Sequence, residues 1–254
     1  MRKAFIVTGG ANGIGRAIVE EVVRTGGLAL GIDTDDLSGA MLEARYSPEQ
    51  FRFFQGDISD KQVLEDFIRW SVEAAGEIGA LINNACYSSG GLTDCGYDDF
   101  EKVLRVGVVA PFYLTKLLLP HFAPGAAIVN IASTRAFMSQ PETESYSAAK
   151  GGIIALTHAM CATLAGRVRV NAISPGWIDT GSFQHDDKYE PAYSEADERQ
   201  HPSGRVGRPE DIARMALFLC SESAGFIDGE NITIDGGMTK LMIYHNDFDW
   251  KLDT

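Results

Sequence analysis

The chain has 254 residues and a formal net charge of -13. This length is ordinary for one α/β domain, and no Pro/Ser-rich linker or shift in composition divides it, so we expect a single domain over residues 1–254. The negative charge argues against binding to nucleic acid or anionic membranes, because both require clusters of Lys and Arg. The first apolar run ends near Gly9, too soon for a signal sequence or a membrane span, and we expect a cytoplasmic protein.

Cysteine and histidine residues give no indication of a disulfide framework or a metal site. The four cysteines lack paired spacing, which favours reduced thiols. The five histidines have no Cys or carboxylate neighbours at ligand spacing, so we expect no metal.

Short β-branched runs alternate with amphipathic stretches along the chain. The expected strands are residues 4–8, 28–33, 51–55, 80–83, 126–132, 168–173 and 231–234. The expected helices are residues 13–25, 61–75, 98–121, 145–165 and 209–220. Strands this apolar need cover on both faces, so the pattern predicts an α/β Rossmann fold: a doubly wound parallel sheet of about seven strands flanked by helices on both faces. The polar segment 181–204 interrupts the alternation and is either a solvated insertion or a lid over a substrate site.

A glycine-rich turn joins the first strand to the first helix. It reads Thr8-Gly9-Gly10-Ala11-Asn12-Gly13-Ile14-Gly15. The glycines at 9, 13 and 15 permit a tight turn and close backbone approach to a pyrophosphate, which the N–H groups of the helix N-terminus attract. Glycine also serves any tight turn, so this loop alone is a weak indication of a dinucleotide site.

Asp33 ends the second strand, about 20 residues beyond the glycine loop, where a carboxylate binds the adenosine ribose. The same carboxylate repels a 2′-phosphate, and no Lys or Arg precedes Arg16 in the loop or follows Asp33 at Thr34. The sequence therefore predicts NAD rather than NADP. The alternative is that Asp33 is an ordinary polar strand end.

Tyr146 and Lys150 stand four residues apart on an expected helix and so share one face. A phenol is a poor acid or base near pH 7, but an adjacent ammonium stabilises the phenolate. We expect Tyr146 to be an acid/base group. For an isolated match, a plain exposed Tyr/Lys pair would be the better interpretation.

The order of these motifs along the chain resembles that of the short-chain dehydrogenase/reductase family, in its shorter, classical type. The resemblance covers nearly the entire chain. The glycine turn is similar to the family's cofactor loop, and Tyr146-x-x-x-Lys150 matches its Tyr-x-x-x-Lys motif. Ser133 stands where the family's catalytic serine stands. Further similar segments are Asp57-Ile58 (adenine contact), Asn83-Asn84-Ala85 (most of Asn-Asn-Ala-Gly), Asn171 to Thr180 (closing over nicotinamide), Gly207-Arg-Pro-Glu-Asp-Ile-Ala and Asp235-Gly236-Gly237.

The resemblance implies hydride transfer between NAD(H) and a secondary alcohol or ketone, a small-molecule substrate. Tyr146 would move the proton, Lys150 would hold the nicotinamide ribose and stabilise the phenolate, and Ser133 would hydrogen-bond the substrate oxygen. The expected cofactor-binding residues are Gly9, Asn12, Gly13, Ile14, Gly15, Asp33, Asp57, Ile58, Asn83, Ala85, Tyr146, Lys150, Pro175, Gly176, Ile178 and Thr180. The resemblance also implies a homo-oligomer, a tetramer or a dimer.

Gly107 departs from the family pattern, which has an asparagine after Val106 that anchors a water between the lysine and solvent. Glycine supplies no side-chain amide and costs about 1 kcal/mol in a helix interior relative to Ala. Either a main-chain carbonyl and a water carry the proton relay, or turnover is impaired. The latter leaves open an NAD-binding sensor or scaffold whose turnover has lapsed.

Cys86 is a second departure, because the motif has glycine there. We favour packing as a small hydrophobe over a reactive thiol. A further alternative function, an NADP-dependent ketoreductase, is disfavoured by Asp33.

The sequence does not rank substrates. Residues 86–96, 136–145 and 181–204 are the variable segments expected to choose among them, and their composition is ambiguous. Four residues could either form an apolar wall of the substrate site or simply pack in the core: Phe137, Met138, Phe183 and Tyr189. Glu142 and Glu144 could either favour hydroxylated substrates or simply be solvated. The tail 238–254 mixes apolar and acidic residues and is expected to pack on the protomer or cross an oligomer interface.

Overall fold

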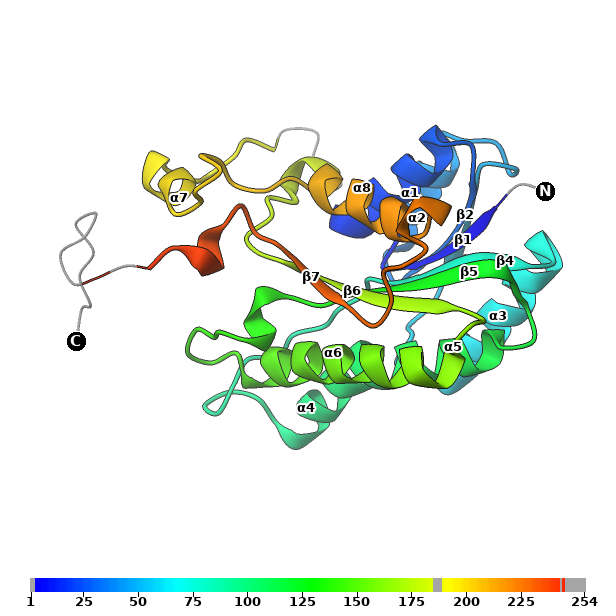
Figure 1. Cartoon of the computed structure of the whole chain (residues 1–254), viewed down its shortest axis with the longest axis horizontal. Helices are drawn as coiled ribbons and strands as arrows, with labels where there is room; N and C mark the ends of the chain where they lie inside the picture. The colour runs from blue at the N-terminus through cyan, green and yellow to red at the C-terminus, as the bar shows by residue number, and fades with distance from the viewer. Residues whose placement is uncertain (1–2, 185–188, 243, 245–254) are drawn as a thin grey trace.

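The computed structural model describes residues 3–184, 189–242 and 244. Its centre is a seven-stranded sheet in the order β3-β2-β1-β4-β5-β6-β7, with every neighbouring pair parallel (Figure 1). The strands are β1 (Ala4–Thr8), β2 (Leu28–Asp33), β3 (Phe51–Gln55), β4 (Ile78–Asn83), β5 (Phe122–Ile131), β6 (Arg169–Pro175) and β7 (Asn231–Ile234). The strand order reverses between β1 and β4, which is where open α/β sheets bind their ligands.

Helices cover both faces of the sheet (Figure 1). On one face lie α1 (Gly13–Arg24), α2 (Asp36–Glu43) and α8 (Pro209–Leu219), and on the other α3 (Lys61–Ala75), α4 (Tyr97–Leu104), α5 (Ala110–Leu118) and α6 (Glu144–Leu164). A short helix, α7 (Glu195–Arg199), lies away from the sheet. The predicted doubly wound fold is confirmed. None of the described helices combines the length and apolar composition that a membrane span requires.

The apolar faces of the helices fill two cores, one on each side of the sheet. Residues four apart, such as Ile18 and Val22 of α1 or Leu114 and Leu118 of α5, are fully buried against it. All residues of β1 and β4 are buried because these central strands have helices on both sides.

The expected helix over residues 98–121 is wrong in detail. The chain forms α4, one π-helical turn (Arg105–Val109) and α5, and β5 already begins at Phe122. Helix α2 was not expected, because it is short and contains Gly39. A Cβ at Gly39 would lie 2.1 Å from the Phe53 ring, so close packing on β3 requires glycine in this helix.

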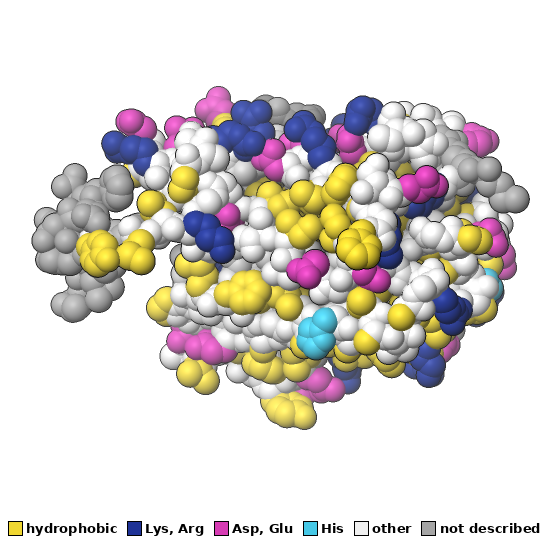
Figure 2. Space-filling view, viewed as in Figure 1, with side chains coloured by type: hydrophobic (Ala, Val, Ile, Leu, Met, Phe, Trp, Pro, Cys, Tyr) yellow, Lys and Arg dark blue, Asp and Glu magenta, His cyan; other side chains and the backbone are white. Residues whose placement is uncertain are grey.

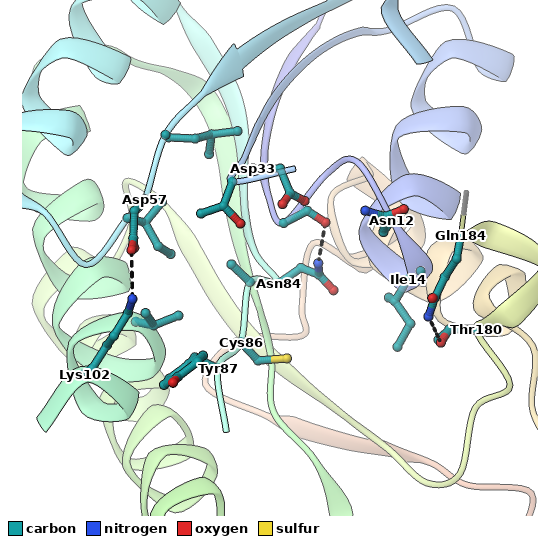
Figure 3. Close-up of a pocket in the computed structure, with 18 residues that line it drawn as sticks. Asn12, Ile14, Asp33, Asp57, Asn84, Cys86, Tyr87, Lys102, Thr180 and Gln184 are labelled. Carbon is teal, nitrogen blue, oxygen red and sulfur yellow. Dashed lines mark hydrogen bonds and ion pairs between the residues drawn. The ribbon is translucent and has the colours of Figure 1, made fainter. Parts of the chain in front are cut away.

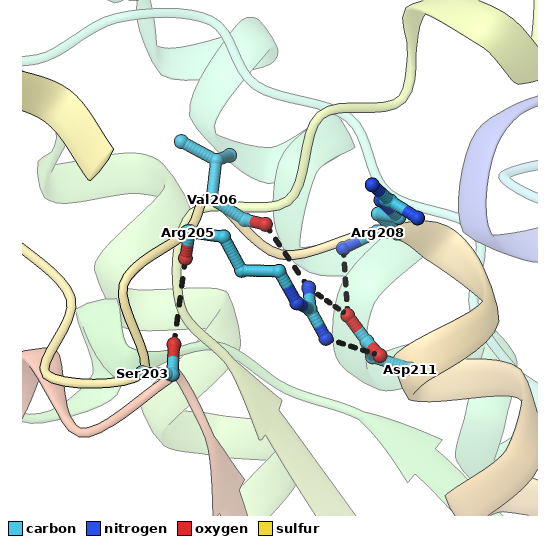
Figure 4. A network of polar contacts seen from close by, with 5 residues as sticks. All are labelled: Ser203, Arg205, Val206, Arg208 and Asp211. Carbon is cyan, nitrogen blue, oxygen red and sulfur yellow. Dashed lines mark hydrogen bonds and ion pairs between the residues drawn. The ribbon is translucent and has the colours of Figure 1, made fainter. Parts of the chain in front are cut away.

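A polar network fixes the start of α8 (Figure 4). Arg205 Nη1 and Nη2 donate to the two carboxylate oxygens of Asp211 at 2.7 and 2.9 Å, and the Arg208 N–H donates to Asp211 at 2.9 Å. Between these residues, the Gly207 N–H donates to the carbonyl of Trp177 at 3.1 Å. The network therefore ties α8 to the segment that follows β6.

Asp211→Ala is expected to lower the free energy of unfolding by about 1–2 kcal/mol near neutral pH, because it removes the cap and the Arg205 pair. The Arg205 hydrogen bonds hold the pKa of Asp211 below its ordinary value of 3.8. The stabilisation is therefore present above that value and is lost as pH falls through the lowered pKa. Urea unfolding at pH 7 and in acid measures it. Asp66→Ala, which removes an exposed pair with Arg69, should cost less than about 0.5 kcal/mol, and an equal cost would contradict the cap.

Candidate active site

The carboxyl ends of β1, β2 and β4 open into a cavity of about 600 Å³ (Figure 3). It lies at the reversal of strand order, where the fold leaves space between the two halves of the sheet. The lining residues are Gly9, Asn12, Gly13, Ile14, Ile32, Asp33, Thr34, Gly56, Asp57, Ile58, Asn84, Ala85, Cys86, Tyr87, Lys102, Val106, Thr180 and Gln184.

The glycine turn has the shape that a dinucleotide pyrophosphate needs. Gly9 and Gly13 have positive φ angles of 65° and 55°, which few other residues adopt. A Cβ at Gly15 would lie 1.8 Å from the Gly9 carbonyl oxygen, so only glycine lets α1 begin this close to the turn. The Asn12 side chain donates to Asp35 at 2.8 Å rather than capping α1, which leaves the first N–H groups of the helix beside the cavity. These features fit a nicotinamide dinucleotide.

Asn84 and Thr8 hold the far wall of the turn. Asn84 Nδ2 donates to the carbonyls of Thr8 and Gly9 at 3.0 and 3.1 Å, and Thr8 Oγ1 accepts from the N–H groups of Asn84 and Ala85 at 3.0 Å. Neither residue was among the expected cofactor-binding residues, although both stand inside the quoted motifs. The side chain of the expected Asn83 is instead buried in the core.

Asp33 closes the cavity at the end of β2. Its carboxylate accepts from the Ala11 N–H at 3.1 Å and from the Asp35 N–H at 3.2 Å. These bonds fix the carboxylate beside the glycine turn, and Thr34, which also lines the cavity, follows it.

An ion pair lies across the cavity from the glycine turn (Figure 3). Lys102 Nζ is 3.1 Å from Asp57 Oδ2 and 5.2 Å from the centre of the Tyr87 ring. Burial pushes the pKa of Asp57 upward, but hydrogen bonds from Ser59 and Lys102 together bring it below its ordinary value. Lys102 and Tyr87 were not expected here. Lys102 precedes Val106 by one helical turn, and that spacing was the available signal.

A second cavity, of about 770 Å³, contains Ser133 and Tyr146. Its lining residues are Ser88, Ser133, Thr134, Arg135, Gln140, Thr143, Tyr146, Gly176, Trp177, Ile178, Asp197, Gln200 and Met238. The volume is in the range of small-molecule sites.

Lys150 is buried beneath this cavity, 5% exposed. Its Nζ donates to the Ile131 carbonyl at 2.7 Å and lies 5.4 Å from the centre of the Tyr146 ring. The Ser133 hydroxyl accepts from the Arg135 N–H at 3.2 Å, which orients it at the end of β5. The structure thus brings the sequence-predicted Ser133, Tyr146 and Lys150 into one neighbourhood.

Two sets of hydrogen bonds position α6, which carries Tyr146 and Lys150. At its start, Ser145 Oγ donates to the Gly90 carbonyl at 2.7 Å. In its middle, a buried chain runs from Asn83 Nδ2 to Asn130 Oδ1 and from Asn130 Nδ2 to Thr157 Oγ1, both at 2.8 Å. This chain joins β4, β5 and α6, so Asn83 orients the helix rather than lining a cavity.

Comparison with known proteins decides the family. A family model described as enoyl-(acyl carrier protein) reductase matches residues 9–239. An uncharacterized oxidoreductase of Thermotoga maritima is 38% identical over 250 residues, 95% of this chain and 98% of that protein. The chain belongs to the short-chain dehydrogenase/reductase family. It is therefore an oxidoreductase of alcohol or carbonyl groups that uses a nicotinamide cofactor and a small-molecule substrate.

Solved structures of other family members are similar. An apo SCOR enzyme from Clostridium thermocellum is 41% identical with a TM-score of 0.90, and 100% of both chains is covered. A short-chain dehydrogenase/reductase SDR:glucose/ribitol dehydrogenase from Brucella melitensis is 29% identical with a TM-score of 0.85, covering 94% of this chain and 99% of that one. The expected family is confirmed.

The other expected residues of this dehydrogenase/reductase fall into three groups. Those in the first cavity are Gly9, Asn12, Gly13, Ile14, Asp33, Asp57, Ile58, Ala85 and Thr180. Those in the second are Gly176 and Ile178 with Ser133 and Tyr146. Gly15, Asn83, Lys150 and Pro175 are buried and line neither cavity.

Gly107 has a packing role in this family member. It lies in the π-helical turn against α6, and a Cβ there would be 2.8 Å from the Cβ of Ala149. The glycine therefore lets the turn approach α6 immediately before Lys150. This close contact explains why a glycine stands at position 107, although glycine is less stable in a helix than alanine.

The variable segments contribute polar rather than apolar groups to the second cavity. Phe137 and Met138 are exposed, and Phe183 packs on the core beside α1. Tyr189 donates to Asp179 at 2.6 Å, and none of the four lines the cavity. The described part of segment 181–204 instead lines it with Asp197 and Gln200.

Glu142 and Glu144 do not line the second cavity either. Glu142 accepts from the Thr93 N–H at 3.0 Å, which joins the β4–α4 and β5–α6 loops, and hydrogen bonds from the side chain and the backbone of Thr93 lower the pKa of Glu142. Cys86 is exposed and lines the first cavity, so its side chain does not pack in the core as a small hydrophobe. Tyr87, the next residue in the chain, has the centre of its ring 5.2 Å from Lys102 Nζ.

Proposed function

We propose that this chain transfers hydride between NAD(H) and a secondary alcohol or ketone, with Tyr146 as general acid/base. The observation that carries the proposal is that Ser133 and Tyr146 line one cavity directly above Lys150, while a neighbouring cavity has the glycine turn of a dinucleotide site. When bound, the nicotinamide supplies the hydride acceptor and donor, C4 of its ring.

Each residue has a separate task in alcohol oxidation. Tyr146 accepts the hydroxyl proton as the C–H bond of the same carbon breaks. Ser133 Oγ donates a hydrogen bond to the substrate oxygen and so stabilises its developing charge. Lys150 Nζ donates one hydrogen bond to the Ile131 carbonyl and makes no second hydrogen bond among the described residues. Its other N–H groups serve the ribose hydroxyls and a water, and its charge stabilises the Tyr146 phenolate.

The cofactor we propose is NAD rather than NADP. Asp33 is held against the glycine turn, and its charge opposes a 2′-phosphate. Among the described lining residues the cationic side chain is Lys102. It forms an ion pair with Asp57, and both residues lie across the cavity from the glycine turn. Arg16 pairs with Glu20 at 3.0 Å and does not line the cavity.

Asp33→Ala is expected to weaken NAD binding about tenfold and to strengthen NADP binding, because a ribose acceptor and a repulsive charge are removed together. Titration of both cofactors by intrinsic fluorescence measures the change. Asp36→Ala, which removes an exposed carboxylate of α2, should leave both affinities unchanged. Tighter binding of NADP than NAD by the unaltered chain would contradict the assignment.

A coupled assay tests the function itself: the purified chain, NAD and a broad panel of alcohols, followed by NADH formation. Clear NAD binding without turnover of any alcohol, and without reduction of any ketone by NADH, would favour the sensor or scaffold. The packing of Gly107 on Ala149 gives the glycine a structural reason that is independent of turnover.

We further propose a cytoplasmic homo-oligomer, a tetramer or a dimer. All four cysteines are free thiols, as a reducing compartment favours. Apolar side chains gather over α8, β7 and α6 on one face (Figure 2). Phe218 of α8 and Phe226, in the segment between α8 and β7, are exposed, and β7 is an edge strand of the sheet. An exposed apolar surface next to an edge strand suits a second copy. Most of the tail 238–254 lies outside the described residues.

A further inference from the structure

The second cavity is walled mainly by polar side chains. Besides Ser133 and Tyr146 it has the hydroxyls of Ser88 and Thr143 and the amides of Gln140 and Gln200. Thr134 and two charged side chains, Arg135 and Asp197, complete the polar part of the wall, and the apolar part consists of Trp177, Ile178 and Met238. A substrate that fills this cavity displaces water from all of these groups and has to replace the lost hydrogen bonds.

Arg135 brings a positive charge to the wall of the cavity that contains Ser133 and Tyr146. It stands two residues after Ser133 on the turn Thr134–Ala136, and its Nη2 donates to Gln140 Oε1. Because Gln140 itself lines the cavity, the pair holds the guanidinium in the wall. A guanidinium offers hydrogen-bond donors and no acceptor.

Asp197 supplies the opposite charge from α7. The backbone N–H and the hydroxyl of Ser194 donate to its Oδ2 at 2.7 and 2.9 Å. These hydrogen bonds lower the pKa of Asp197, so the carboxylate is ionised at neutral pH. An ionised carboxylate offers acceptors and no donor.

The wall therefore combines a hydrogen-bond donor (Arg135), an acceptor (Asp197), and several hydroxyl and amide groups that can both donate and accept. An alcohol hydroxyl both donates and accepts, so a molecule with several hydroxyls can satisfy every one of them. A steroid or an acyl chain could not replace the hydrogen bonds that these groups make to water, and sites built from polar groups reject such analogues strongly. The charges of Arg135 and Asp197 are opposite, so the wall has no net charge that would favour an anionic sugar phosphate over an uncharged ligand.

We propose that the substrate is a small, uncharged polyhydroxylated molecule, a sugar or a polyol, selected by Arg135, Asp197 and Gln200. This inference rests on the proposed function, since it assigns the substrate of the same site. Asp197 accepts from substrate hydroxyls away from the reacting carbon, while Ser133 and Tyr146 bind the hydroxyl that is oxidised.

Matched substrates test the class. The purified chain with NAD is assayed on pentoses, hexoses and alditols, each beside a secondary alcohol of the same carbon number with one hydroxyl, and beside a hydroxysteroid and a sugar phosphate. We expect kcat/KM for the best polyhydroxylated substrate to exceed that of its monohydroxy partner by at least about a hundredfold. A monohydroxy alcohol, hydroxysteroid or sugar phosphate that equals or exceeds it would overturn the substrate class and leave the proposed function intact. No turnover of any alcohol would count against the proposed function instead.

Asp197→Asn separates recognition from chemistry. It keeps the shape and an acceptor for Ser194, and should raise KM for the best polyhydroxylated substrate about tenfold while kcat changes less than about threefold. The monohydroxy partner should be unaffected. Glu198→Gln, at the next position of α7 and outside the cavity lining, is the control. An unchanged KM, or an equal loss on both substrates, would contradict the role of Asp197, and Gln200→Ala offers an independent measurement of the same kind.

Discussion

Replacement of Tyr146 by phenylalanine is expected to reduce kcat about a thousandfold while NAD binds as before. The variant keeps the ring near Lys150, whose Nζ lies 5.4 Å from its centre, and removes only the hydroxyl that carries the proton. Packing around α6 is retained, so the thermal midpoint should not fall. Steady-state formation of NADH on the best alcohol, together with a fluorescence titration of NAD, measures the two effects separately.

Tyr193→Phe is the matched control for this prediction. It removes a phenolic hydroxyl close to the second cavity, where Tyr193 packs edge-on against Trp177 at 6.1 Å, but not from its lining. Its kcat should stay within about threefold of the unaltered chain. Retention of more than a tenth of the turnover by Tyr146→Phe would exclude Tyr146 as the acid/base group. A parallel loss of NAD affinity would instead show that the phenol acts in cofactor binding.

The fold was predictable because its signals are local. Buried parallel strands such as residues 4–8 are continuous apolar runs, and their alternation with helices leaves few other arrangements. The boundaries within residues 98–121 were not predictable, since the π-helical turn depends on how it and α4 pack on α6. Helix α2 was missed because the demand for Gly39 comes from Phe53, on another strand.

The candidate site was predictable where a residue's role follows from backbone shape or sequence spacing. The glycine turn and the pair Tyr146 and Lys150 belong to that kind. Asp197 and Gln200 reach the second cavity through tertiary packing, and no spacing in the sequence joins Asp197 to Ser133. Substrate recognition was therefore the part that the sequence could not predict.

Addition of one methyl group at Gly107 should destabilise the protein and slow it. The new Cβ of Gly107→Ala would lie 2.8 Å from the Cβ of Ala149, closer than two such atoms approach, so the π-helical turn and α6 must separate. We expect a net loss of about 1–3 kcal/mol in the free energy of unfolding, even though alanine favours a helix by about 1 kcal/mol over glycine. Because Ala149 precedes Lys150, the displacement also moves the catalytic pair, and kcat should fall about tenfold or more.

A double-variant cycle separates this packing from the proton relay. Gly107→Ala with Ala149→Gly exchanges the two Cβ positions, and should recover turnover and most of the stability apart from the helix cost of the new glycine. The control variant is Gly151→Ala, in α6 like Ala149. No atom lies within 4 Å of the added Cβ, so this substitution should not destabilise the chain. If Gly107→Ala alone matched the unaltered chain, the packing explanation would be wrong. An asparagine brings the same Cβ, so Gly107→Asn tests the relay only in the Ala149→Gly background. There, a large gain in kcat over Gly107→Ala with Ala149→Gly would show that the relay of the natural chain is impaired, and equal values would show that a main-chain carbonyl and water suffice.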